Sequence, residues 1–185
     1  EVSSMLDQGA NINDPVPNNN SFLHLLIMNQ APPTLVLAVV NDLGAELSMI
    51  DLDGCRALEK CILLDREPCP YLALLLKSRK MTFEEFKNNT SGKTIRQFAI
   101  DNNRTCAAKL IQDELNSRLW EILLHVTSQD KNNTAIVDEC GKWIACGADI
   151  NHQYTDNTYD RWTPLHLACK LSTAATVTHL IERKK

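Results

Sequence analysis

Three stretches of the sequence end an apolar, helix-like pattern in the same way. They are LDQGANIN (6–13), VVNDLGAEL (39–47) and WIACGADIN (143–151). In each, a Gly followed by Ala stands where the apolar pattern stops. Helices commonly end at a residue with left-handed backbone, and glycine adopts that conformation with the least strain. A stop that recurs along one chain restricts the fold to an array of short helices.

A new helix start follows each stop at a related distance. The starts are SFLHLL, RALEKC and TPLHLA. The spacing is 8 residues from Asn13 to Ser21, 8 again from Ser48 to Arg56, and 12 from Asn151 to Thr163. Regular spacing of this kind is typical of repeat proteins. The larger last spacing predicts an insertion in the segment before Thr163.

TPLHLA after GADIN, and SFLHLL after GANIN, resemble the ankyrin repeat family. The motifs are specific in residues 143–171, and elsewhere the resemblance rests on register. It implies an all-α solenoid in which each repeat is a β-turn or hairpin, a helix, a short turn and a second antiparallel helix. It also implies a protein-binding scaffold that contacts its partner through hairpin tips and the concave inner faces of the first helices.

The register predicts about five repeats after a partial one. Residues 1–13 resemble the second helix of a repeat whose first half is missing. Repeat one is expected to have a first helix over Phe22–Met28, a second helix starting at Pro32-Pro33 and a stop at Gly44. Repeat two is expected to have a turn at Asp51–Gly54 and helices near 57–64 and 69–78. Repeat three is expected to have a turn at SGKT (91–94) and the helices IRQFAID and TCAAKLIQDEL.

No Gly or Pro occurs between Lys93 and Cys140, and RLWEILLHV follows the second helix of repeat three directly. We therefore expect a break in the stack near 115–118 and two sub-arrays, 1–115 and 116–185. Repeat four is expected at about 117–150, with TSQDKNN between its helices, and repeat five from Asn151. Because both ends of the chain fall within a repeat, we expect a fragment of a larger protein that is monomeric as a fragment.

Composition narrows the classes of partner. The net charge of -4 and the pI near 5.7 argue against nucleic acid, which requires clustered Lys and Arg. No apolar run approaches the roughly 20 residues that span a bilayer, so membrane insertion is not expected. The seven cysteines form no CxxC pair and are odd in number, which predicts no zinc site and reduced thiols in a cytoplasmic protein.

The histidines admit a catalytic and a structural interpretation. The resemblance implies that the Thr of TPLH caps the helix and that His24 and His166 bond to neighbouring loop backbone. A nucleophile pair of Cys169 with His166 lacks an oxyanion hole and an orienting third group. SGKT resembles the tail of a phosphate-binding loop, but Lys87 stands where that motif needs Gly. We expect no active site, metal or cofactor, and no enzyme.

Partner contacts are therefore expected from two sets of positions that the resemblance implies. The turn positions are Asn18, Asn19, Asn20, Leu52, Asp53, Cys55, Ser91, Lys93, Tyr159, Asp160 and Trp162. The inner-helix positions are Met28, Asn29, Leu63, Leu64, Asp101, Asn102, Lys170 and Leu171. From both sets, the candidate partner-binding residues are Tyr159, Asp160, Trp162, Lys170, Leu171, Asn19, Asn20, Met28, Asn29 and Asp53.

Trp162 is the most informative candidate, because exposed aromatic residues are favoured interface anchors. The lengthened hairpin HQYTDNTYDR is expected to push Tyr154, Tyr159 and Trp162 outward together; the alternative is that Trp162 packs against the stem of its own hairpin. Trp120 and Trp143 lie in apolar helical patterns and are expected in the core. A second functional hypothesis is a substrate-recruiting or autoinhibitory arm of a larger enzyme.

Overall fold

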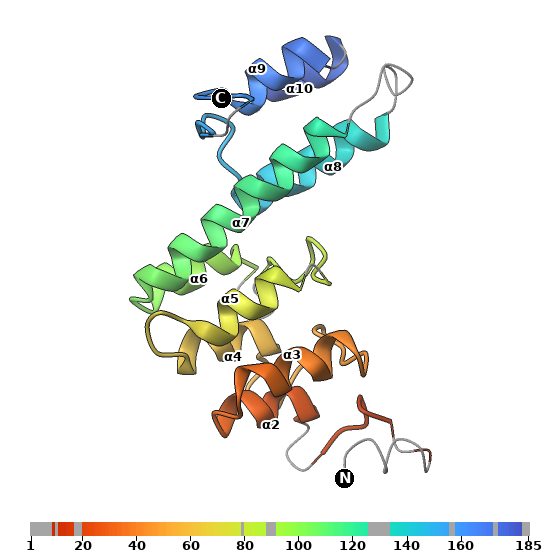
Figure 1. Ribbon diagram of the computed structural model, residues 1–185, viewed down its shortest axis with the longest axis vertical. Helices are drawn as coiled ribbons and strands as arrows, with labels where there is room; N and C mark the ends of the chain where they lie inside the picture. Colours follow the sequence, from red (N-terminus) through yellow and green to blue (C-terminus); the bar gives the residue numbers. More distant parts are fainter. Residues whose placement is uncertain are drawn as a thin grey trace. The chain divides into compact units, whose positions relative to one another are not determined.

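The computed structural model describes residues 9, 11–16, 20–78, 80–87, 92–125, 134–155, 158–171 and 174–182. Within these residues the regular structure is helical, with single antiparallel bridges in the connections (Figure 1). The all-α class is therefore confirmed. The helices are α2 (Phe22–Met28), α3 (Pro33–Asn41), α4 (Ala57–Leu64), α5 (Pro70–Lys77), α6 (Ile95–Asp101), α7 (Thr105–Leu124), α8 (Thr134–Cys146), α9 (Pro164–Leu171) and α10 (Ala174–Glu182).

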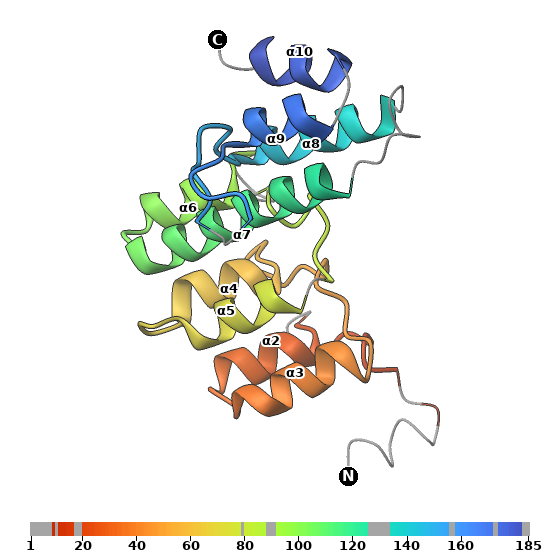
Figure 2. The same ribbon diagram turned by 45° about the horizontal axis from the view of Figure 1, so that its top comes forward.

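Two compact units make up the chain, an N-terminal unit of Glu1–Leu110 and a C-terminal unit of Ile111–Lys185. In the N-terminal unit, α2 packs against α3 and α4, and α4 packs against α5 and α6. Figure 2 shows the α2–α3 pair of that unit beside the α4–α5 pair. In the C-terminal unit, α10 packs against α8 and α9. Paired short helices that contact their neighbours are the arrangement the register predicts.

The helix starts lie where the sequence places them. The Ser21 hydroxyl accepts a hydrogen bond from the main-chain N–H of His24 at 3.3 Å, and the Thr94 hydroxyl accepts one from Gln97 at 3.2 Å. These hydroxyls satisfy N–H groups that have no partner inside the helix. Proline opens α3, α5 and α9, where its missing N–H is not needed. Residues 92–94 of SGKT form the turn before α6, as predicted, and Ser91 lies outside the described residues.

The three glycines of the recurring stop all have left-handed backbone. Their φ angles are 92° at Gly9, 72° at Gly44 and 111° at Gly147. A side chain at these angles would be strained, which explains why glycine occupies the position. The stop motif is thus a requirement of the backbone, as the sequence indicates. Residues 1–8 and 10 of the expected partial repeat lie outside the described residues.

The helices expected on either side of residues 115–118 are continuous, because α7 runs through those residues as one helix of 20 residues. Nothing in this stretch ends a helix: it contains no Gly or Pro, and the Arg118 guanidinium pairs with Glu114 one turn earlier at 2.6 Å. One helix therefore serves as the second helix of repeat three and the first of repeat four. The boundary between the two compact units lies inside α7, and TSQDKNN lies outside the described residues.

Each unit has an apolar core formed by the inward faces of its helices. Trp120 and Trp143 are buried, which confirms their expected core position. None of the described helices combines the length and apolar character that a bilayer span requires. Fully buried side chains include Leu23, Ile27, Ile62, Leu72, Leu75, Phe86 and Ile95 in the N-terminal unit, and Leu115, Leu119, Leu123 and Leu167 in the C-terminal unit.

Side chains of one repeat bond the main-chain carbonyls of the repeat before it. The Tyr71 hydroxyl donates to the Ala31 carbonyl at 2.6 Å, and the Arg104 guanidinium donates to the Leu63 carbonyl. The Lys80 ammonium donates to the carbonyls at residues 40 and 41. These acceptors lie near helix ends, where carbonyls have no partner inside the helix.

The continuity of α7 can be tested at Ser117. Proline there removes an intrahelical hydrogen bond and clashes with the preceding turn, so Ser117→Pro should destabilise the chain by about 3 kcal/mol. Ser117→Ala, the matched control, should change stability by less than about 0.5 kcal/mol. Urea unfolding followed by circular dichroism measures both. If proline were tolerated as well as alanine, a new helix would begin at this residue and the continuous helix would be wrong.

Candidate partner-binding surface

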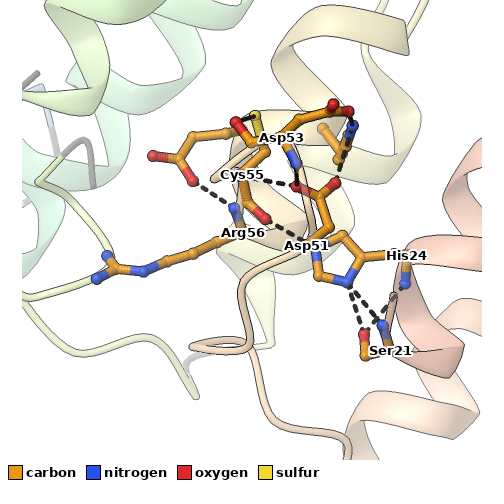
Figure 3. Close-up of polar contacts among 8 residues, drawn as sticks. Ser21, His24, Asp51, Asp53, Cys55 and Arg56 are labelled. Carbon is orange, nitrogen blue, oxygen red and sulfur yellow. Dashed lines mark hydrogen bonds and ion pairs between the residues drawn. The ribbon is translucent and has the colours of Figure 1, made fainter. Parts of the chain in front are cut away.

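His24 holds two consecutive repeats together (Figure 3). Its Nδ1 accepts from the main-chain N–H of Ser21 at 3.2 Å and lies 2.8 Å from the Ser21 hydroxyl. Because Nδ1 accepts, the proton of the neutral ring lies on Nε2, which donates to the Cys55 carbonyl at 3.1 Å. Burial lowers the pKa of His24 and so favours the neutral ring. The predicted structural role of His24 is confirmed.

The turn that receives His24 is built on a buried ion pair. Asp51 accepts from the main-chain N–H groups of Asp53 and Cys55, each at 2.9 Å. The Lys60 ammonium lies 2.8 Å from the Asp51 carboxylate and 2.6 Å from that of Asp53. Burial alone would raise the pKa of Asp51, but the bonds from Lys60 and the turn backbone lower it. Asp53, a predicted partner contact, is exposed but already belongs to this turn.

Arg56 stands where the other repeats have Ser or Thr and begins α4 differently. Its main-chain N–H donates a hydrogen bond to the Glu59 carboxylate at 2.5 Å. Its guanidinium donates to the carbonyls of Glu84 and Lys87, 28 and 31 residues further along. The residue therefore makes a contact between repeats like that of His24, with different chemistry.

His166 repeats the local half of the His24 arrangement. Its Nδ1 accepts from the Thr163 N–H at 3.1 Å and lies 2.9 Å from the Thr163 hydroxyl. The ring thus stabilises the start of α9, and its predicted structural role is confirmed. A Cys169–His166 pair would need a ring nitrogen to accept the thiol proton, and the cap already uses Nδ1.

Some of the predicted partner contacts of the N-terminal unit are exposed and others are not. Met28 and Asn29 are exposed at the end of α2, as expected. Asn20, also a predicted partner contact, is buried, with only 7% of the residue exposed. The physical reason is that the main chain of Asn20 bridges to Val16 and closes the turn before α2. Asn19 lies outside the described residues.

The lengthened hairpin before α9 packs on α7 through two stacked aromatic rings, Tyr154 and Trp120, which we call the stem. The Tyr154 ring stacks on Trp120 of α7, with ring centroids 4.0 Å apart, and its hydroxyl donates to the Asn116 carbonyl. Main-chain bonds between Tyr154 and residues 161 and 162 close the hairpin. The expectation that Tyr154 points outward is therefore wrong. It packs inward because Trp120 offers a ring face and Asn116 a carbonyl.

Tyr159, Trp162 and Lys170 come together at the outer side of this hairpin. The ring centroids of Tyr159 and Trp162 are 5.3 Å apart, and both side chains are half-buried. The Lys170 ammonium lies 5.1 Å from each centroid, a distance at which ring faces attract cations. Tyr159 also meets Trp120 edge-on at 5.9 Å. We call Tyr159, Trp162 and Lys170 the hairpin triad.

The remaining predicted residues lie near the triad in sequence. Asp160 is exposed at the hairpin tip, and Leu171 ends α9, although its side chain lies outside the described part of the chain. Sequence reasoning selected all three triad residues but missed the stem formed by Trp120 and Tyr154. The stem pairs a tyrosine of the insertion with a tryptophan 34 residues earlier, and no local sequence pattern indicates such a pairing.

A pocket of about 350 Å³ lies between α7 and α8 in the C-terminal unit. The Arg118 guanidinium lies 5.8 Å from the Trp143 ring at this pocket and pairs with Glu114. Among the residues that the structure describes, its lining holds neither Cys nor Ser, the common nucleophiles of covalent catalysis. The lining residues are Arg118, Glu121, Ile122, His125, Ile136, Glu139 and Trp143.

All seven cysteines are free thiols. Four of them are buried, and burial raises the pKa of Cys140 to about 12, which keeps that thiol protonated. Buried protonated thiols act as small apolar side chains rather than nucleophiles. Among the described residues, no three His, Cys, Asp or Glu side chains gather closely enough to bind a metal ion.

The fold has a counterpart among solved structures. The chain is similar to the ankyrin repeat domain of Bcl-3, a crystal structure described as that of a unique member of the IkappaB protein family. The two share 18% sequence identity with a TM-score of 0.50, over 98% of this chain and 78% of that one. No protein-family model and no curated sequence matches the chain. The chain has the ankyrin-repeat fold, and the resemblance stated from its sequence is confirmed at that level.

The two histidines provide a matched test of the contact between repeats. His24→Ala removes a fully buried ring and its bond to the Cys55 carbonyl, which keeps the Asp51 N–H as its other donor, so a loss of about 2–4 kcal/mol is expected, mostly from the buried ring. His166→Ala removes an exposed ring and should cost less than about 1 kcal/mol. Urea denaturation of both variants measures the difference. Equal losses would mean that the bond to Cys55 contributes nothing.

The lowered pKa of His24 also predicts a pH dependence. Below the ordinary value of 6.5 the unfolded chain binds a proton that the folded chain resists, so stability present above that pH is lost as the pH falls. His24→Gln, which does not titrate, should lose less stability than the wild type between about pH 7.5 and 5.5. The other four histidines are common to both proteins and cancel. Parallel pH profiles of the urea midpoints would contradict the prediction.

Proposed function

We propose that this chain is a protein-protein interaction module, and that the hairpin triad is its principal contact with a partner. The observation that carries the proposal is that Tyr159 and Trp162 are half-buried rings on a hairpin whose base packs on α7. Tyr154 is held by its stacking on Trp120 and by its bond to Asn116. A surface ordered before binding loses little conformational entropy on association, which favours affinity.

Exposed apolar side chains in the N-terminal unit support a second contact region. Met28 ends α2 and is 45% exposed, and Leu64 ends α4 and is 47% exposed. Leu52, in the turn before α4, is 71% exposed. Neighbouring exposed apolar residues in a repeat protein are common at interaction surfaces. These residues occupy the inner-helix and turn positions that the resemblance implies for partner contacts.

The proposed function involves binding alone, without catalysis. The ring nitrogens of His24 and His166 that face their caps are engaged in helix starts. We also propose a cytoplasmic location, which the seven free thiols favour because such thiols persist in reducing compartments. A regulatory arm of a larger enzyme would use the same surface, so the partner experiment below applies to that role as well.

Trp162→Ala should weaken partner binding by about tenfold or more while the chain stays folded, because the indole is an anchor whose stem remains in place. The measurement is the recovery of cellular proteins on immobilised wild type, Trp162→Ala and Tyr159→Ala/Trp162→Ala, followed by titration of the proteins recovered by the wild type.

Ile181→Ala is the matched control, since it removes an exposed apolar side chain from α10 in the same unit. It should bind as the wild type does. Thermal melts of all variants accompany the titrations, and Trp162→Ala should lose about 1 kcal/mol or less. A collapsed melt for Trp162→Ala would instead show that Trp162 is part of the hairpin core. Unchanged binding by a folded variant would contradict the proposal.

A further inference from the structure

The charge of the hairpin triad indicates which kind of partner it selects. Lys170 lies in the last turn of α9 and is exposed. Its ammonium is held by the faces of Tyr159 and Trp162, and among the described residues no carboxylate lies within 4.0 Å of it. Ring faces attract a cation but do not replace the oxygen acceptors that its three N–H groups bond best. The ammonium thus keeps donors for an acceptor from outside.

A cationic ligand is disfavoured at the same place. The two ring faces already hold one positive charge, so a Lys or Arg from a partner would meet like charge within a few ångströms. Residues 152–171 contain two acidic side chains, Asp156 and Asp160, and two basic ones, Arg161 and Lys170, so this stretch has no net charge in a chain of net charge -4. The preference for an anionic group therefore depends on the Lys170 ammonium itself.

The rings define what must accompany the anionic group. Tyr159 and Trp162 are half-buried, so each leaves part of its apolar surface beside the ammonium. An aliphatic or aromatic side chain packs on such a surface, while a carboxylate one or two residues away reaches Lys170. This combination is typical of acidic segments that carry interspersed apolar residues.

We propose that the hairpin triad binds an acidic segment of a partner protein, with an Asp or Glu carboxylate on Lys170 and an adjacent apolar side chain on Tyr159 and Trp162. The proposal rests on the interaction function proposed above and specifies the chemistry of its partner. Binding of this kind places the charge contact at the rim and the apolar contact at the centre.

Three labelled peptides test the charge requirement. They share a central Leu-Phe pair and differ only in the flanking residues, which are Glu, Gln or Lys. Fluorescence anisotropy on the whole chain at about 50 mM salt should rank the Glu peptide tightest and the Lys peptide weakest. The preference for Glu over Gln should shrink at about 300 mM salt. Equal affinity for the Glu and Gln peptides, or a preference for Lys, would overturn the proposal.

Substitutions in the chain assign the effect to the triad. Lys170→Ala should weaken the Glu peptide roughly fivefold to tenfold and leave the Gln peptide unchanged. Lys109→Ala, which removes an exposed lysine from α7, is the matched control and should leave both unchanged. Asp160→Asn removes the one acidic side chain of residues 158–171 and should strengthen the Glu peptide. Equal effects of the two lysine variants would overturn the assignment.

The peptide experiment separates this inference from the proposed function. Trp162→Ala should weaken both the Glu and the Gln peptide, because it removes the apolar contact. If Trp162→Ala weakens partner recovery and Lys170→Ala has no effect on any peptide, the interaction function stands and the acidic partner is wrong. If none of the peptides binds, the acidic segment is also wrong, and the recovery experiment alone decides the interaction function.

Discussion

The structure depends on hydrogen bonds that side chains of one repeat make to main-chain carbonyls of a neighbouring repeat. Short helices and tight turns leave many carbonyls without an internal partner, and a buried carbonyl without a bond destabilises the fold by about 1–3 kcal/mol. Here the donors come from about one repeat length away: Tyr71 bonds Ala31, 40 residues earlier, and His24 bonds Cys55, 31 residues later. A helix pair of this size cannot bury its own apolar face, so these bonds and the shared core together stabilise it.

The same requirement explains how such divergent repeats keep one fold. His24 reaches the following turn through an imidazole, whereas Arg56, at the start of the next repeat, reaches its following loop through a guanidinium. Both donate to main-chain carbonyls of the following turn or loop, and the carbonyls of Cys55 and Glu84 also accept a main-chain N–H there, although the two side chains share neither size nor charge. What recurs is the position of a donor rather than the identity of a residue. This accounts for a fold similar to a solved ankyrin repeat domain at 18% identity when no family model matches the sequence.

Local signals predicted most of the fold, and the differences have both local and long-range causes. Pro33, Pro70 and Pro164 mark helix starts because their geometry fits only the first turn, and Gly44 and Gly147 mark stops because of their positive φ. The continuity of α7 was missed, although the absence of Gly and Pro that prompted the predicted break is the reason the helix continues. Asn20 is buried in a local turn closed with Val16, whereas the inward packing of Tyr154 depends on Trp120 and Asn116, more than 30 residues earlier. For the candidate site, sequence register selected Tyr159, Trp162 and Lys170, but their mutual contact follows from the stem on Trp120.

The hairpin also shows how one insertion can separate stability from recognition. Its inner side is fixed by Tyr154, which stacks on a tryptophan that is 5% exposed and bonds a main-chain carbonyl of α7. Its backbone is closed by bonds between Tyr154 and residues 161 and 162, and these need no particular side chain at position 162. The stacking of Tyr154 on Trp120 and its bond to Asn116 do not involve the Trp162 indole, which packs on Tyr159 instead. Under the proposed function, this division of contacts leaves position 162 to specify the partner.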